Sequence, residues 1–260
     1  MNDVSFLGTF RVGTGSNARC AGSGVAGRET IAYLFQNPNH MFDREVITQR
    51  FWSDEDRENS KPALNNVASR LRRALEKSKI KSVVLRADKW SIGIYLEDEE
   101  LTDTRALSLA LRQLQLGEGD PQELYRRIQD LYRGEFLPGH SNCWTMIERE
   151  RMLSIYVRAM LLVTERLFRE KAYNEATDCC RAILAHDPLR ESVHRRLMLL
   201  QVLRGEGGKM CQHYSNFKNT LRAECCAAPT WRTQSLFAVL SKEPSRSQLE
   251  SIVNGEISVD

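Results

Sequence analysis

The side chains with the clearest capacity for chemistry lie between positions 61 and 89, where amide, hydroxyl and guanidinium groups follow one another closely. Asparagine pairs through two hydrogen bonds with adenine, and arginine pairs in the same way with guanine, in a DNA major groove that admits a helix. The segment holds nine Lys and Arg residues against two Asp and Glu residues, a net charge of +7. It is typical of a surface that faces a polyanion.

A helix over residues 62–77 would present these groups on one face. Leu64, Val67, Leu71 and Leu75 recur at helical spacing, which predicts a buried stripe with the polar groups opposite it. A solvated basic surface helix is the alternative interpretation of this pattern. The candidate DNA-binding residues, in the helix and in the hairpin after it, are Lys61, Asn65, Asn66, Ser69, Arg70, Arg72, Arg73, Lys77, Arg86 and Lys89.

The elements that must position this helix follow in the order strand, three helices, hairpin. That order is typical of a winged helix-turn-helix, which places its recognition helix in the major groove and its wing on phosphates or in the minor groove. We expect one or two short strands in 4–12, a Gly/Ser/Ala-rich loop in 13–27, a helix from Arg28 that ends before Asn37-Pro38-Asn39, a helix capped by Asp43, a loop from Ser53 to Pro62, and strands at 83–86 and 90–96.

An acidic run, Glu97 to Glu100, precedes a sequence whose apolar residues have helical spacing throughout. Helices are predicted near 104–116, 121–133, 145–170, 173–185, 189–204, 208–223 and 231–241. A shift of 34 positions, the tetratricopeptide period, places Ala176 and Cys180 on Met210 and Tyr214, so we expect repeated helix pairs.

The predicted fold is therefore predominantly α, with an α+β winged helix-turn-helix followed by an all-α tetratricopeptide-like domain. The expected domains are 1–96 for the winged helix, 97–103 for an acidic connector, 104–245 for the helical domain and 246–260 for a C-terminal tail. Residues 1–96 have a net charge of +5 and residues 97–260 a net charge of −2. The chain's small net charge of +3 conceals a basic first domain.

Other patterns favour structural roles over catalytic ones. No apolar run approaches the ~20 residues of a membrane span, and the N-terminus lacks a signal pattern, so we expect a soluble, cytoplasmic protein. The seven cysteines contain no C-x-x-C and predict reduced, mostly buried thiols. Gly22 to Gly27 spells G-x-G-x-x-G without the βαβ context of a nucleotide site. His186 and His194 lack metal-ligand spacing, and Trp144 is expected to anchor domain packing. No enzyme activity, cofactor or metal is predicted.

Two sets of motifs together resemble the SARP-type antibiotic regulatory proteins. The winged-helix part of the resemblance lies in Arg44 to Asp54 and Ala63 to Leu75. The second part resembles the bacterial transcriptional activator (BTAD) domain, and its motifs are Leu131 to Gly139, Trp144, Glu148 to Arg151, Asp187 to Glu191, His194-Arg195, Leu197-Met198, Tyr214, Lys218, Leu221, Glu224 and Pro229-Thr230.

The resemblance implies a transcription activator that binds repeated promoter sites on double-stranded DNA and recruits RNA polymerase. It implies base and backbone contacts by Asn65, Asn66, Ser69, Arg70 and Arg73, a wing contact by Arg86, and a Ser53 to Lys61 loop that faces polymerase. The helical domain would support a homodimer and could take a small-molecule or protein effector. The wing turn departs from the family, since Ala87-Asp88-Lys89 stands where glycines are usual.

A second hypothesis is a helical-repeat adaptor that binds a protein partner or senses a ligand. Its winged helix would be a docking module that does not read DNA. The cluster of Arg70, Arg72, Arg73 and Lys77 favours the DNA-binding interpretation, because a docking module has no need of so many cations. For the activator we expect a nucleoid-associated protein in the cytoplasm.

Overall fold

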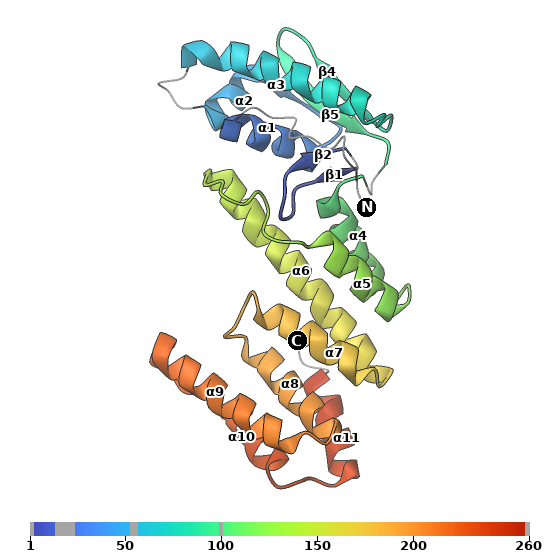
Figure 1. Cartoon of the computed structure of the whole chain (residues 1–260), viewed down its shortest axis with the longest axis vertical. Coiled ribbons are helices and arrows are strands. Elements are labelled where there is room, and N and C mark those ends of the chain that lie inside the picture. Colours follow the sequence, from blue (N-terminus) through green and yellow to red (C-terminus); the bar gives the residue numbers. More distant parts are fainter. Residues whose placement is uncertain (1–2, 14–23, 53–56, 99–100, 258–260) are drawn as a thin grey trace. The chain divides into compact units, whose positions relative to one another are not determined.

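The computed structural model describes residues 3–13, 24–52, 57–98 and 101–257, which form two compact units (Figure 1). The first unit takes in residues 1–117 and 126–156, and the second takes in 118–125 and 157–260. Two helices, α5 (Pro121–Leu131) and α6 (Cys143–Arg169), contribute residues to both units. The domain boundaries predicted from the sequence, with a connector at 97–103, differ from the boundaries of these two units and stay a prediction.

The N-terminal segment of the first unit is fastened to a helix almost 100 residues later. Strands β1 (Val4–Ser5) and β2 (Arg11–Val12) pair antiparallel, which confirms the predicted short strands. Helix α4 (Asp103–Gln115) begins at Asp103, whose carboxylate accepts hydrogen bonds from the backbone N–H groups of Phe6 and Leu7 and from the Ser5 hydroxyl. Burial raises the pKa of Asp103 above its ordinary value, against the opposing effect of these donors.

The winged helix consists of three helices packed with a small antiparallel sheet. Its elements are α1 (Gly24–Gln36), β3 (His40–Asp43), α2 (Arg44–Phe51), α3 (Arg57–Lys77), β4 (Val83–Ala87) and β5 (Ser91–Leu96). The sheet order is β3-β5-β4, so β5 lies between the other two strands. Contacts join α1, α2 and α3 to one another and α3 to β4. The predicted order of three helices and a hairpin is confirmed, and the N-cap by Asp43 is confirmed by its hydrogen bond from the backbone N–H of Glu45.

Three local expectations in this part were wrong. Helix α3 begins at Arg57, so 57–61 is not a loop, and Pro62 lies inside the helix. Proline removes one bond of the helix ladder close to the helix start, and the burial of Ser60 shows that the first turns pack on the protein. Helix α1 begins at Gly24 within the predicted Gly/Ser/Ala-rich loop, while 14–23 and 53–56 lie outside the described residues. Strand β3 was not expected.

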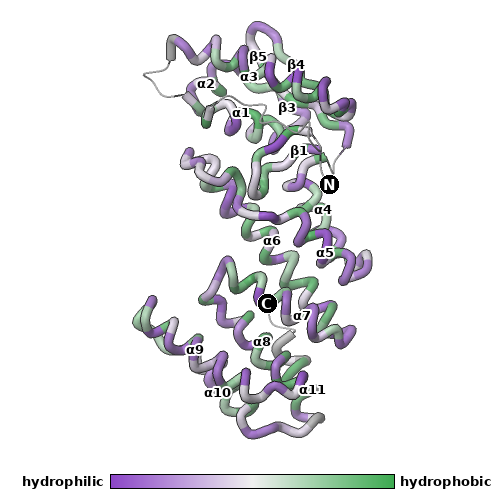
Figure 2. Tube along the Cα trace, viewed as in Figure 1, coloured by the Kyte–Doolittle hydropathy of each residue, from purple (hydrophilic) through white to green (hydrophobic). Residues whose placement is uncertain are grey.

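The second unit is a succession of helices packed around one largely buried helix, α8 (Glu191–Leu203). Its other helices are α7 (Tyr173–Leu184), α9 (Gly207–Cys225), α10 (Trp231–Leu240) and α11 (Arg246–Ile257). Contacts join α8 to each of the other four, and its residues Val193 to Gln201 are all buried. Apolar and hydrophilic residues alternate along these helices, as an amphipathic pattern requires (Figure 2). The seven predicted helices of residues 104–241 are confirmed. Residues 246–257, within the segment that the sequence analysis assigned to a C-terminal tail, are helical.

An aromatic cluster forms part of the core of the first unit. The Trp144 ring, at the start of α6, lies edge-on to Tyr33, Phe51 and Phe136 at centroid distances of 5.1, 5.9 and 5.8 Å. The first two rings come from α1 and α2 of the winged helix. The expected packing role of Trp144 is therefore confirmed, because edge-to-face aromatic pairs at this spacing are favourable.

Within the described residues, no helix combines the length and the apolar character needed to cross a membrane.

Candidate nucleic-acid interface

Helix α3 has two chemically opposite faces, as its sequence predicts. Leu64, Val67, Leu71 and Leu75 are each no more than 5% exposed and pack toward the winged-helix core. On the other side the polar candidates are exposed, with Ser69 half-buried among them. The structure places Lys61, Asn65, Asn66, Ser69, Arg70, Arg72, Arg73 and Lys77 on α3, Arg86 on β4, and Lys89 in the turn after β4.

Arg44, which the sequence analysis did not include among the DNA-binding candidates, connects α2 to α3 and to the wing turn. Nη2 of Arg44, the first residue of α2, donates to Oδ1 of Asn65 at 2.5 Å. Nη1 of the same side chain donates to the backbone carbonyl of Asp88 in the wing turn at 3.4 Å. The amide oxygen of Asn65 is thus occupied, and its NH2 group is the part that can donate to DNA.

A sequence signal for Arg44 exists. A helix N-terminus carries partial positive charge and favours acidic side chains in its first turn. A cation directly after the N-cap Asp43 works against that preference, which indicates that the side chain has a partner elsewhere.

The guanidinium of Arg73 lies back along its own helix. Its Nε reaches the Ser69 carbonyl at 3.4 Å and its Nη2 reaches the Ser69 hydroxyl at 3.2 Å. Both bonds are long and exposed, so water or a DNA acceptor can replace them at small cost.

The Nζ of Lys61 lies 3.8 Å from a carboxylate oxygen of Glu45, but both side chains are about 70% exposed and the pair is weak.

The wing turn is built around the side chain of Asp88. The carboxylate of Asp88 accepts hydrogen bonds from the backbone N–H groups of Trp90 and Ser91 and from the Ser91 hydroxyl. These donors, the N–H of Trp90 first, lower the pKa of Asp88. No residue from Ala87 to Ser91 has positive φ, so the turn needs no glycine.

The cations of the wing rest on aromatic rings. The guanidinium of Arg86 lies 4.3 Å from the ring centroid of Tyr95, and the ammonium of Lys89 lies 4.7 Å from that of Trp90. Trp90 is 71% exposed at the tip of the wing, a large aromatic surface that the sequence analysis did not include among the candidates. An exposed indole beside a lysine fits a surface that meets another molecule.

The other polar motifs of the sequence have structural surroundings. His194 is buried and stacked on Phe217, as a packed histidine would be. The thiols of Cys179 and Cys180 are buried, and burial raises both pKa values, that of Cys180 to about 12. In contrast, Cys143, Cys211, Cys225 and Cys226 are exposed, so the expectation of mostly buried thiols is wrong for them. Among the described residues no group of three or more His, Cys, Asp or Glu side chains could hold a metal ion.

A winged helix with this exposed face, followed by helical repeats, defines a DNA-binding transcription regulator. The family model "Bacterial transcriptional activator domain" matches residues 103–240, more than half of the chain, and "Transcriptional regulatory protein, C terminal" matches residues 26–88. The chain therefore belongs to the bacterial transcriptional activator domain family. With the winged helix in front, it is a transcriptional activator of the SARP type, which confirms the resemblance found in its sequence.

A solved structure shares the fold. The chain is similar to Mycobacterium tuberculosis EmbR in complex with a low-affinity phosphopeptide, with a TM-score of 0.75 and 15% sequence identity. The match covers 98% of this chain and 69% of EmbR. No curated protein matches the sequence.

Proposed function

We propose that the protein activates transcription by binding repeated promoter sites on double-stranded DNA through α3 and the wing, and by recruiting RNA polymerase. The observation that carries this proposal is the division of α3 into a buried apolar face and an exposed face of amide and guanidinium groups. An exposed helix of this composition has the side chains that read base edges in the major groove. The activity requires no catalysis, and the protein would be nucleoid-associated in the cytoplasm.

The ten candidate residues divide by the contact that each can make. Asn66, Arg70 and Arg73 lie in the middle of the exposed face and would meet base edges, with Asn65 and Ser69 beside them. The basic residues toward the ends and on the flank of α3, and those of the wing, would contact phosphates, which position the protein without reading sequence. These are Lys61, Arg72, Lys77, Arg86 and Lys89.

Selection of bound sites from random double-stranded DNA, followed by titration at several salt concentrations, tests this proposal. We expect an enriched repeat and a logarithmic salt slope of about −4.5 for ~5 phosphate contacts per protomer. Affinity that is indifferent to salt, or a pool without enrichment, would contradict it. In that case the adaptor hypothesis predicts a protein partner that stays bound after nuclease treatment.

Polymerase recruitment is proposed for residues 53–61, which follow α2 and run into the start of α3. The family resemblance implies that residues 53–61 face polymerase. Of these, residues 57–61 form the first turn of α3. Replacement of the exposed Asn59 by Ala should lower transcription in a reconstituted assay while DNA affinity is unchanged. Equal loss of both would place Asn59 in the DNA contact.

Binding to repeated sites further suggests a homodimer on DNA. Light scattering of the protein with duplexes that carry one or two repeats should give one and two protomers per duplex. Cooperative binding should be seen only on the longer duplex, and two independent monomers would contradict the dimer.

A further inference from the structure

A polar cavity of about 310 Å³ lies in the first unit, away from the exposed face of α3. It is lined by three helices that are distant in sequence: Gln36 comes from the end of α1, five residues come from α4, and Arg151 comes from α6. Its size is at the lower end of the ~300 to 1,000 Å³ of small-molecule sites, so it suits a compact ligand.

One face of α4 supplies most of the polar lining. Arg105, Ser108 and Arg112 are spaced i, i+3 and i+7 and therefore share a side of the helix. The opposite side is buried in the core, through Leu107 and Leu114 among others. With Arg151 added, the described lining residues include three guanidinium groups and no carboxylate.

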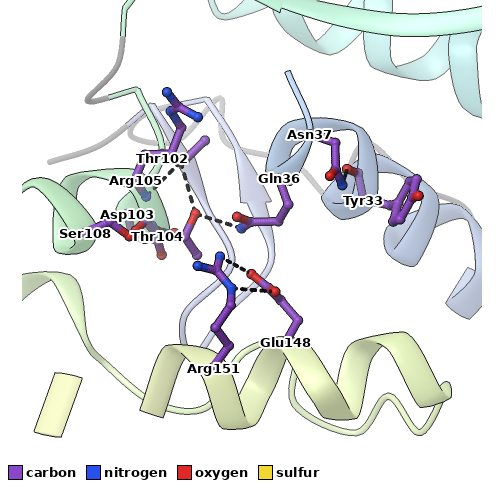
Figure 3. Close-up of polar contacts among 10 residues, drawn as sticks. All are labelled: Tyr33, Gln36, Asn37, Thr102, Asp103, Thr104, Arg105, Ser108, Glu148 and Arg151. Carbon is purple, nitrogen blue, oxygen red and sulfur yellow. Dashed lines mark hydrogen bonds and ion pairs between the residues drawn. The ribbon is translucent and has the colours of Figure 1, made fainter. Parts of the chain in front are cut away.

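The uncharged polar groups that line the cavity are joined by hydrogen bonds (Figure 3). Nε2 of Gln36 donates to Oγ1 of Thr104 at 2.8 Å, and that hydroxyl lies 3.1 Å from the hydroxyl of Thr102. The Ser108 hydroxyl donates to the Thr104 carbonyl at 2.9 Å. These bonds fix the amide and hydroxyl groups before any ligand enters, which limits the entropy lost on binding.

The third guanidinium is oriented from α6. The carboxylate of Glu148 accepts from Nε and Nη2 of Arg151, at 2.8 and 2.5 Å, and the pair rises from α6 toward Gln36 and Thr104 (Figure 3). A guanidinium has five N–H groups, and this pair uses one edge of it. The other edge of Arg151 can donate into the cavity.

We propose that this cavity binds a small molecule that bears a phosphoryl group. A phosphoryl group has three strong acceptor oxygens and a charge near −2, whereas a carboxylate has two oxygens and one charge. Three arginines from two helices, with hydroxyl groups between them, match the tetrahedral group better than the planar one. Since Gln36 ends the first helix of the winged helix, such a ligand would contact both the DNA-binding part and the first helix of the activator domain.

Calorimetric titration with pyrophosphate, in a chloride buffer of low ionic strength, tests the proposal on the full chain. We expect one saturable site per chain. Arg112→Gln should weaken binding about tenfold or more, and Arg112→Lys should have an intermediate effect, because it keeps the charge but loses the two-pronged hydrogen bonding. The matched control is Arg158→Gln, an exposed arginine two turns further along α6 that does not line the cavity and should change nothing.

Three outcomes would overturn the proposal. They are the absence of saturable binding, an equal effect of Arg158→Gln, and malonate binding as tightly as pyrophosphate does. Ser108→Ala offers a second variant should Arg112→Gln fold poorly, and it too should weaken pyrophosphate binding.

The DNA affinity of Arg112→Gln separates this proposal from the proposed function. The DNA affinity of this variant should equal that of the wild type. A joint loss of pyrophosphate binding and DNA binding would instead indicate that the cavity residues contact DNA. Failure to bind pyrophosphate with DNA binding intact would reject the ligand site alone.

Discussion

Nη2 of Arg44 donates a hydrogen bond to Oδ1 of Asn65, and so connects the first residue of α2 to the exposed face of α3. The same guanidinium reaches the backbone of the wing at Asp88. One side chain thus restrains the two elements proposed to contact DNA. Because asparagine presents both a donor and an acceptor, this bond also decides which end of Asn65 faces outward.

Removal of this restraint should weaken specific DNA binding. Arg44→Ala is expected to cost about 1 kcal/mol of binding free energy on the selected site, because one charge-assisted hydrogen bond no longer orients Asn65. The measurement is a double-mutant cycle with Asn65→Ala, and the two changes should be non-additive by about 0.5 kcal/mol or more. Strict additivity would show that the two side chains act independently on DNA.

Asn66 and Lys89 should affect DNA binding in different ways. Asn66→Ala should cost about 1 to 3 kcal/mol on the selected site and relax sequence preference at one position, since it removes a base contact. Lys89→Ala should weaken selected and random duplexes alike and reduce the salt slope by about one. Titrations on both duplexes distinguish the two, with the exposed Lys242→Ala as control. Equal losses for Asn66→Ala on both duplexes would show that it does not face bases.

The wing should depend on a carboxylate instead of a glycine. Asp88→Ala removes the acceptor of three hydrogen bonds from Trp90 and Ser91, so the turn should loosen while the rest of the chain stays folded. We expect faster hydrogen exchange at the amides of Trp90 and Ser91, weaker binding to all duplexes and an unchanged melting temperature. Asp88→Asn keeps one acceptor oxygen, so its exchange rates and its DNA affinity should lie between those of the wild type and those of Asp88→Ala. Unaltered exchange would mean that the strands alone define the turn.

The α3 interface was predictable because its signal is local and periodic. The stripe from Leu64 to Leu75 follows the 3.6-residue period, and once it is buried the helix geometry alone directs Asn66 and Arg70 outward. The start of the helix was not predictable in the same way. Pro62 reads as a helix boundary, and only the packing of the preceding turn, with Ser60 buried, overrides that local preference.

Features that depend on distant partners left little trace in the sequence. Strand β3 has four residues and exists because β5, about 50 residues later, pairs with it. Helix α11 has four large apolar residues at helical spacing, Leu249, Ile252, Val253 and Ile257, which is too short a pattern to separate from a tail. The bond between Arg44 and Asn65 and the cavity beside Arg112 arise only when separate helices are brought together.

A pair of histidines in the second unit leads to a prediction about pH. Nδ1 of His194 and Nε2 of His213 lie 2.9 Å apart, and Nε2 of His194 lies 2.8 Å from the Pro188 carbonyl. The carbonyl only accepts, so neutral His194 carries its proton on Nε2, and its Nδ1 accepts from His213. A second proton on His194 would place two N–H groups against each other.

Acidification should therefore destabilise the second unit. Burial, and then the neighbouring charge of His194, lower the pKa of His213 to about 4, and burial also lowers the pKa of His194. The unfolded chain, with a histidine pKa near 6.5, binds more protons than the folded chain between about pH 6.5 and 4. The stabilisation is thus complete above pH 6.5 and is lost as the pH falls through that range. Denaturant unfolding followed from pH 7.5 to 5 measures it.

The matched variants are His213→Gln and His186→Gln. Glutamine at 213 retains an N–H donor for Nδ1 of His194 but does not titrate, so it should flatten the dependence of unfolding free energy on pH. His186 is exposed and lies outside the pair, and its replacement should leave the slope as in the wild type. If both variants keep the wild-type slope, carboxylates and not the histidine pair govern the acid sensitivity of this unit. A flattened slope in His213→Gln alone assigns that sensitivity to the partly buried bond between His194 and His213.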